Sequence, residues 1–218
     1  MTPLLDVQDI GYSQHGEALL APVSLRLNPG EQLMLTGPSG SGKSTLLKII
    51  ASLLEPTTGS LLFKGEPVAR LRPELYRRQV SYCFQTPTLF GETVRDNLAF
   101  PWRIREKTAD AALLRSWLEK VRLPGDWLDK DIGQLSGGEK QRVALLRNLQ
   151  FLPDVLLLDE ITSALDEENR QAIAGLIDKE AVQQGTAIIW ISHDKAEIDR
   201  AQRLIELHKP TGNLNEPA

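Results

Sequence analysis

The sequence lacks the features of a membrane-spanning, secreted or disulfide-bonded protein. A single cysteine, Cys83, excludes a disulfide framework within the chain and is typical of a reducing cytosol. No run of about 18 apolar residues is present, so we expect no membrane-spanning helix. Residues 1–6 carry no basic segment followed by an apolar core, and we expect no signal peptide. The net charge of −4 and the lack of a dense basic patch argue against nucleic acid as a partner.

Internal repeats and low-complexity segments are also missing. The remaining composition, 41% hydrophobic and 25% charged over 218 residues, is ordinary for a soluble globular protein with a sizeable core. We therefore expect a single domain over residues 1–208. The segment 209–218 is polar and rich in residues that break regular structure, so we expect it to be frayed.

Apolar patterning divides the chain into strands and helices. Fully apolar runs such as 155–158 predict buried parallel strands, and apolar residues at helical spacing predict a helix over 108–121. Strands that alternate with helices in the second half predict a parallel α/β sheet, and the strand-rich start predicts an added antiparallel edge. Residues 86–135 change in pattern and indicate a helical insert. The expected strands are 4–12, 23–27, 33–36, 59–63, 80–85, 155–158, 186–191 and 201–207, and the further helices are 138–151 and 167–184.

A glycine-rich stretch between an apolar run and a helix start is the most informative feature. It consists of Gly37, Pro38, Ser39, Gly40, Ser41, Gly42, Lys43, Ser44 and Thr45. The pattern G-x-x-x-x-G-K-[ST] in this setting predicts a loop that binds the phosphates of ATP or a similar nucleotide, rather than an ordinary glycine turn. Glycines let successive backbone N–H groups point at an anion, and the helix adds the positive end of its dipole. Lys43 would reach the β- and γ-phosphates, and the Ser44 hydroxyl would ligate Mg²⁺.

Two acidic residues follow the apolar strand at 155–158. Ligands of open α/β sheets bind beyond the carboxyl ends of the strands, which places Asp159 to bind the Mg²⁺ of a nucleotide. Glu160 projects one residue further, where it could polarise an attacking water. Taken alone, the pair could equally be an acidic helix cap, but the phosphate loop favours the functional interpretation.

A serine and two glycines, Ser136, Gly137 and Gly138, begin the helix expected at 138–151. Exposed backbone N–H groups at such a position form a second anion-binding site. The same residues, with Glu139 three positions after the serine, also match a plain capping box, and both interpretations can hold together.

These motifs together resemble the nucleotide-binding subunit of ATP-binding cassette (ABC) transporters, over about residues 4–207. The resemblance implies an α/β P-loop NTPase fold of the ABC type, with an antiparallel β subdomain and an inserted helical subdomain. It implies that Tyr12 stacks on adenine, that Gln85 touches Mg²⁺, and that His193 holds the γ-phosphate beside the catalytic Glu160. It also implies that a loop at the dimer interface consists of Ser163, Ala164, Leu165 and Asp166.

The same resemblance implies partners and a location. ATP would lie between the phosphate loop of one copy and Ser136, Gly137 and Gly138 of a second, so that ATP binding produces a homodimer. A chain without membrane spans would need an integral membrane permease on a separate chain, at the cytoplasmic face of the inner membrane. The segment 86–102 and the helical insert would form the groove for a short helix of that permease; alternatively, Leu89, Phe90 and Trp102 pack inside the insert.

Short strings at 85–91, 100–102 and 159–166 resemble one subgroup, the ATP-binding subunits of bacterial iron-export transporters. Ile161 departs from the proline or alanine that this family often has there and could alter the stiffness of the backbone after Glu160, but we do not expect it to abolish hydrolysis, because neither acid is displaced. No cysteine and histidine cluster with metal-ligand spacing is present, so we expect the permease to recognise the cargo.

Two other functions compete with a transport ATPase. A cytosolic ABC-type switch that acts on ribosomes or DNA would be expected to carry two cassettes, a coiled-coil insert or a basic extension, and none of these is present. A subunit that binds ATP without hydrolysing it is disfavoured by the presence of Glu160 and His193. A turnover assay separates that alternative from an ATPase.

Overall fold

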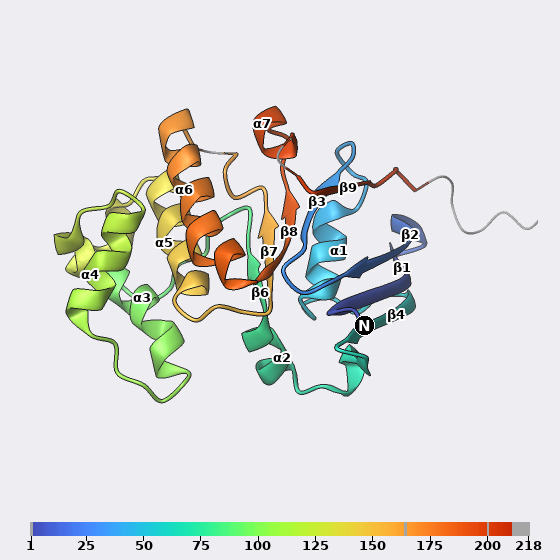
Figure 1. Ribbon diagram of the computed structural model, residues 1–218, viewed down its shortest axis with the longest axis horizontal. Coiled ribbons are helices and arrows are strands. Elements are labelled where there is room, and N and C mark those ends of the chain that lie inside the picture. The colour runs from blue at the N-terminus through green and yellow to red at the C-terminus, as the bar shows by residue number, and fades with distance from the viewer. Residues whose placement is uncertain (1, 164, 200, 211–218) are drawn as a thin grey trace, which may run out of the picture.

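The computed structural model describes residues 2–163, 165–199 and 201–210. Within them, an antiparallel sheet, a parallel sheet and a helical region follow one another along the longest axis of the molecule (Figure 1). From residue 211 onward, the segment that we expected to be frayed lies outside the described residues. No helix of the described chain is long and apolar enough to cross a membrane.

The antiparallel sheet has the strand order β2-β1-β4-β5. Its strands are β1 (Leu5–Gln14), β2 (Glu17–Leu27), β4 (Thr58–Phe63) and β5 (Glu66–Pro67). β1 and β2 form a hairpin whose turn residues His15 and Gly16 both have positive φ, so the strand expected at 23–27 already begins at Glu17. The antiparallel β subdomain that the resemblance implied is therefore confirmed, but its strands form a sheet of their own rather than an added edge of the parallel sheet.

The parallel sheet has the order β6-β7-β8-β3-β9, as the alternation of strands and helices predicts. Its strands are β3 (Gln32–Thr36), β6 (Val80–Cys83), β7 (Val155–Asp159), β8 (Ala187–Ile191) and β9 (Arg203–Glu206). Helix α1 (Lys43–Ile50) covers one face, and α5 (Gly137–Leu149) and α6 (Glu167–Glu180) cover the other (Figure 1). Alternate leucines of β7 enter two separate cores, Leu157 toward α1 and Leu156 and Leu158 toward α5 and α6.

The helical region lies beyond α5 and contains α3 (Val94–Arg103) and α4 (Ala111–Lys120) (Figure 1). α4 begins at Ala111 because Asp110 caps it, three residues later than expected. Sequence patterning missed α3, which carries Pro101 in its interior, and the short α2 (Pro73–Gln79). The expected helix 167–184 ends at Glu180. The remaining helices are α7 (Lys195–Ile198) and 3₁₀ turns at 68–70, 125–129, 132–134 and 182–184.

Candidate functional site

The phosphate loop lies between the end of β3 and the start of α1, as predicted. Gly37, Gly40 and Gly42 all have positive φ, of 135°, 80° and 88°. A Cβ at Gly37 would lie 2.2 Å from the Leu207 carbonyl oxygen, and one at Gly42 would lie 2.6 Å from that of Leu19. Glycine is therefore required at both positions by neighbouring backbone as well as by conformation.

The phosphate loop contains a buried lysine ammonium and a buried hydroxyl without a hydrogen-bond partner among the described residues. Lys43 is buried, and its Nζ donates to the carbonyl oxygens of Gly37 at 2.8 Å and Pro38 at 3.0 Å. Ser41 Oγ is buried and has no hydrogen-bond partner among the described residues. A buried ammonium, an unsatisfied hydroxyl and a helix N-terminus in one glycine loop fit an anionic ligand such as a nucleotide phosphate.

Asp159 ends β7 beneath this loop and is only 2% exposed. Its Oδ1 accepts a hydrogen bond from Ser44 Oγ at 3.0 Å, and its Oδ2 accepts one from Tyr82 Oη at 2.5 Å. Burial, followed by the hydrogen bond to Asp159, raises the pKa of Tyr82 well above its ordinary value, so the phenol keeps its proton and donates. Sequence reasoning missed Tyr82; the signal was a hydroxyl on an otherwise buried strand, since a buried tyrosine needs a partner for its oxygen.

Glu160 lies at the meeting point of three strand ends. Its φ of 48° is unusual for a residue with a side chain, and its N–H donates to the Ile191 carbonyl at 3.0 Å. Gln85 Nε2, from the loop after β6, donates to Glu160 Oε2 at 2.7 Å. His193 Nε2, from the loop after β8, lies 3.1 Å from Glu160 Oε1. The structure therefore brings together three residues that are far apart in the sequence.

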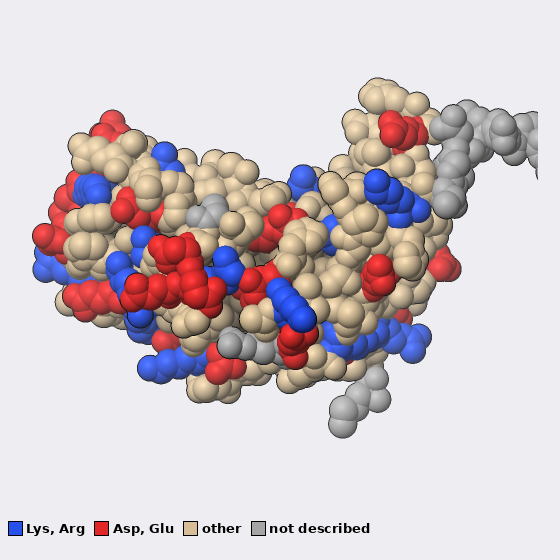
Figure 2. Space-filling model, turned by 90° about the horizontal axis from the view of Figure 1, so that it is seen from above, with Lys and Arg blue, Asp and Glu red and all other residues tan. Residues whose placement is uncertain are grey.

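One cavity of about 210 Å³ joins the phosphate loop to these residues. It is lined by residues 39–45 of the loop, by Glu160 and by His193. Viewed from the end where β8 leads into α7, the molecular surface is hollowed between two lobes, and side chains of both charge signs border the hollow (Figure 2).

The loop after Glu160 is held locally. Ser163 Oγ donates to the Glu160 carbonyl at 2.9 Å, and Asp166 caps α6 through the N–H of Asn169 at 2.8 Å. That backbone hydrogen bond, more than any other contact, lowers the pKa of Asp166. Leu165 and the unusual Ile161 are both buried in the core beside α6. Ala164, the fourth residue of the expected interface loop, lies outside the described residues.

Tyr12 and the residues at the start of α5 are not part of this cavity. Tyr12 is half-buried in β1 and lies opposite Leu20 of β2. Leu20 in turn lies against Gly42 of the phosphate loop, because a Cβ added at Gly42 would touch it. The β1–β2 hairpin that carries Tyr12 therefore borders the phosphate loop. Ser136 and Glu139 form the predicted capping box, with Ser136 N donating to Glu139 Oε2 at 2.8 Å. The helix start is exposed, and a Cβ at Gly137 would meet nothing within 4 Å.

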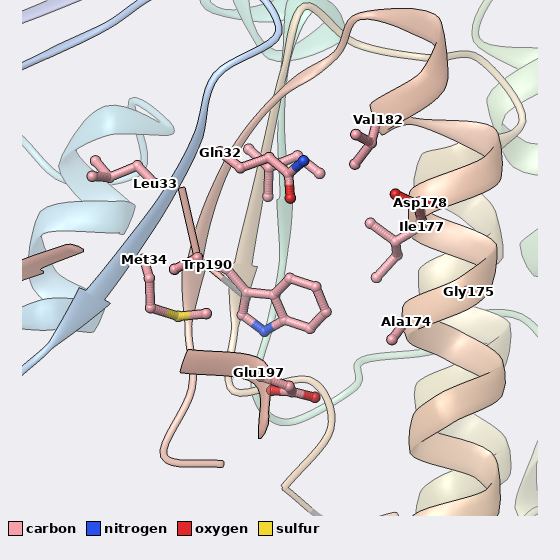
Figure 3. A pocket seen from close by; sticks show the side chains of 12 residues that line it. Gln32, Leu33, Met34, Ala174, Gly175, Ile177, Asp178, Val182, Trp190 and Glu197 are labelled. Atoms are coloured by element: carbon pink, nitrogen blue, oxygen red, sulfur yellow. The ribbon is translucent and has the colours of Figure 1, made fainter. Parts of the chain in front are cut away.

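A separate cavity of about 390 Å³ lies between the parallel sheet and α6, and no predicted site residue lines it. Figure 3 shows Met34 and Trp190 from the strands facing Ile177 from the helix. Glu197 lies at the α7 end of this cavity, where its Oε2 accepts a hydrogen bond from Thr162 Oγ1 at 3.2 Å.

A glycine loop after the buried strand β3, with an acidic pair at the end of β7 in the same parallel sheet, defines a P-loop nucleotide-binding fold. The sequence profile of the ABC transporter family matches residues 20–163. The chain belongs to the ABC transporter family, as its motifs had indicated. Within that family, this fold is the ATP-binding domain whose ATP hydrolysis is coupled to transport.

Several relatives support this assignment. The chain is 53% identical over 215 residues to the probable iron export ATP-binding protein FetA of Escherichia coli (strain K12), covering 99% of this chain and 96% of that protein. It is 36% identical to the ATP-dependent lipid A-core flippase of Cupriavidus metallidurans, over 91% of this chain but only 34% of the flippase. The solved structure of a bacterial Atm1-family ABC exporter with ATP bound matches with a TM-score of 0.84 and 26% identity, over 96% of this chain and 38% of that chain.

Proposed function

We propose that the chain is the ATP-hydrolysing subunit of an iron exporter, and that it works as an ATP-bound homodimer on a membrane permease carried by a separate chain. The observation that carries the proposal is Glu160, which the contacts of Gln85 and His193 hold at the rim of the phosphate-loop cavity. Similarity to a protein named for iron export over nearly the full length of both chains supports the choice of cargo. In this arrangement, the chain lies at the cytoplasmic face of the inner membrane.

The residues of the cavity have separate roles in the proposed reaction. The backbone N–H groups of residues 37–45 and the Lys43 ammonium hold the β- and γ-phosphates. Glu160 accepts a proton from the attacking water, and His193 donates to the γ-phosphate, so that both lie on the same side of the nucleotide. The contact between them fixes the two side chains in relation to each other. Tyr12, on the hairpin beside the loop, provides a ring for adenine.

Magnesium fits the oxygen atoms at the end of β7. Ser44 and Asp159 would hold the ion together with the side-chain oxygen of Gln85, since hydroxyl, carboxylate and amide oxygens suit a hard cation. When bound, the ion supplies charge neutralisation on the phosphate oxygens. The chain contributes the buried position of Asp159, which two hydrogen bonds orient.

The start of α5 is the proposed contact with ATP on a second copy of the chain. Ser136 and Gly137 are exposed and Gly138 is half-buried, and all three lie outside the cavity of their own chain. A two-fold pairing would place each α5 start against the phosphate loop of the other copy, because such an interface is self-complementary. Ser163 and Asp166, both exposed in the segment between Glu160 and α6, would then lie at the same interface.

A groove of about 680 Å³ is the proposed docking site of the permease. Phe84, Phe90, Phe100 and Phe151 line it together with Arg77, Arg78, Arg105 and Arg147. Within the described chain none of these arginines forms an ion pair; Arg78, for example, donates to the Ile104 carbonyl at 2.7 Å. Glu74 also lines the groove but pairs with Arg72, so the four arginines give the groove an excess of positive charge. An aromatic groove of this charge fits an amphipathic permease segment that carries carboxylates. Leu89 and Trp102, in contrast, pack inside the helical region.

The Glu160→Gln variant tests the proposed function, with Glu66→Gln on the distant β5 as its matched control. Light scattering with size-exclusion chromatography should show a Glu160→Gln monomer that becomes a dimer with ATP, while a phosphate-release assay shows loss of turnover. Glu66→Gln should hydrolyse ATP like the wild type. Wild-type turnover in Glu160→Gln would contradict the assigned role, and a monomer under all conditions would contradict the ATP-bound homodimer.

Docking and cargo need two further measurements. In cells that make the permease, Arg78→Glu should reduce the membrane-bound fraction of the chain, whereas Arg70→Glu, exposed outside the groove, should not. Iron export should appear as a lower cellular iron content with the wild type than with Glu160→Gln. Equal iron content would overturn iron as cargo, and a wild-type chain that stays off membranes would favour a cytosolic switch.

A further inference from the structure

Tyr82 reaches two sites at once. From the middle of β6, its hydroxyl donates to Asp159 Oδ2 at 2.5 Å, next to the phosphate loop. Its ring borders the aromatic groove and packs edge-on against Phe84, with ring centroids 4.5 Å apart. Phe84 in turn is 41% exposed in that groove. A single side chain thus connects the wall of the proposed permease groove to the carboxylate proposed to hold magnesium.

We propose that Tyr82 is a positioning residue that orients Asp159 for the metal-bound nucleotide and makes this carboxylate sensitive to what fills the groove. The role deepens the proposed function and rests on it for the magnesium site and for the groove. It does not require the permease for its first test, because the contact with Asp159 is made within this chain.

The two oxygens of Asp159 have different partners, which is the basis for an orienting role. Oδ1 faces Ser44 in the phosphate loop, and Oδ2 is held by Tyr82 on the opposite side. The terminal torsion of an aspartate is soft, so its carboxylate orientation depends on such partners. No other side chain of the described residues donates to Asp159 Oδ2. Without the Tyr82 hydroxyl, a buried charged oxygen would be unpaired, and the carboxylate would turn away from the phosphate loop.

The contacts of the residues next to Tyr82 explain how docking in the groove would change the hydrogen bond to Asp159. Gln141 Nε2 donates to the Phe84 carbonyl at 3.1 Å, and Ser81 Oγ donates to Asn148 Oδ1 at 2.6 Å, so residues on both sides of Tyr82 are hydrogen-bonded to α5, one through its backbone and one through its side chain. A segment that pushes on the Phe84 ring would therefore displace the Tyr82 ring more readily than the strand. Because the ring carries the hydroxyl, its displacement changes the hydrogen bond to Asp159.

The test measures nucleotide binding, not turnover. A fluorescent ATP analogue is titrated with EDTA and again with Mg²⁺, and the ratio of the two dissociation constants gives the gain from Mg²⁺. Tyr82→Phe should keep the wild-type affinity in EDTA within about twofold. Its gain from Mg²⁺ should be roughly tenfold smaller than the gain of the wild type, which is the size expected for the loss of one hydrogen bond to a charged group. Tyr76→Phe is the matched control, because it removes a buried hydroxyl whose partner is the Ile50 carbonyl at 2.6 Å, away from Asp159.

The outcomes separate the two proposals. A Tyr82→Phe gain equal to that of the wild type, or an equal loss in Tyr76→Phe, would overturn the positioning role while leaving the proposed function standing. A wild-type chain that binds no analogue under either condition would overturn both. Both variants are checked for cooperative thermal unfolding, so that a general loss of fold is recognised.

A second pair of variants tests the link to the groove. Phe84→Ala removes the ring that touches Tyr82 and should lower the Mg²⁺ gain by about threefold. This effect is smaller than that of Tyr82→Phe, because the hydrogen bond to Asp159 is weakened rather than lost. Phe151→Ala opens the same groove but removes a ring that packs on Trp102, and its gain should equal that of the wild type. Equal gains in these two variants would overturn the sensitivity of Asp159 to the groove.

Discussion

Replacing Gly37 by alanine should damage the phosphate loop more than any comparable glycine replacement. The new Cβ would lie 2.2 Å from the Leu207 carbonyl oxygen and 2.9 Å from Ser41 Oγ, at a φ of 135° that side chains rarely adopt. Leu207 cannot retreat freely, because its N–H donates to the Thr36 carbonyl at 2.8 Å. Backbone strain alone is worth about 1–3 kcal/mol, and displacement of Leu207 adds to it, so we expect a loss of about 3 kcal/mol in unfolding free energy.

Replacements of two other glycines separate the contribution of backbone strain from that of the steric clash to the lost unfolding free energy. Gly40 has a φ of 80° but meets no atom within 4 Å, so Gly40→Ala carries the left-handed strain of about 1–2 kcal/mol without a clash. Gly137 has neither a positive φ nor a close neighbour, and Gly137→Ala should stay within about 0.5 kcal/mol of the wild type.

Thermal unfolding measures the series directly. At about 2–4 °C per kcal/mol for a chain of this size, Gly37→Ala should lower Tm by roughly 6–12 °C, Gly40→Ala by roughly 2–8 °C and Gly137→Ala by less than about 2 °C. Binding of ATP should weaken in the first variant, because the loop cannot keep its N–H groups aimed at the phosphates. A Gly37→Ala protein with wild-type Tm and wild-type ATP affinity would refute the steric reasoning.

Three further changes probe charge, capping and pH. Lys43→Ala should weaken ATP binding at least tenfold in an equilibrium titration, since the loop loses its only buried ammonium among the described residues; unchanged affinity would remove its phosphate role. Ser136→Ala should lose about 1 kcal/mol of stability with its cap and weaken ATP-driven dimerisation, while ATP binding by monomers stays the same; equal dimerisation would refute the contact between copies. Hydrogen bonds from the backbone of Thr93 and Glu92 lower the pKa of Asp96, so its contribution to stability is present above the unfolded pKa and is lost as pH falls through the folded pKa. Asp96→Asn should therefore flatten the fall of Tm below about pH 4, and an identical acid profile would contradict this.

The parts of the site that are contiguous in sequence could be predicted from the residues alone. The phosphate loop, the strand ending in Asp159 and the capping box of Ser136 each carry their own local signal, because backbone conformation and hydrogen bonding are decided within a few residues. The fold class followed from alternating elements. Only the resemblance to a family suggested Gln85 and His193 as partners in the site, because their meeting at Glu160 depends on the order of strands in the sheet.

The misses have physical causes of the same kind. α3 escaped detection because Pro101 interrupts its pattern, and Asp96 and Thr93 stabilise its start instead. The antiparallel strands were expected as an added edge of the parallel sheet but form a separate sheet, because pairing between strands that are far apart in the sequence produces no local sequence pattern. Tyr82 was missed because its only unusual property is a hydroxyl, and the acceptor of that hydroxyl lies at the end of another strand.

The position of β3 between β8 and β9 has a consequence for biosynthesis. β3 and the loop that follows it are synthesised well before β8 and β9, the two strands that flank β3 in the sheet. Until then, the apolar residues Leu33, Met34 and Leu35 have no strand beside them, and Gly37 has no Leu207 to close over it. The nascent chain should thus be unable to bind nucleotide, and should depend on chaperones, until β8 and β9 have left the ribosome.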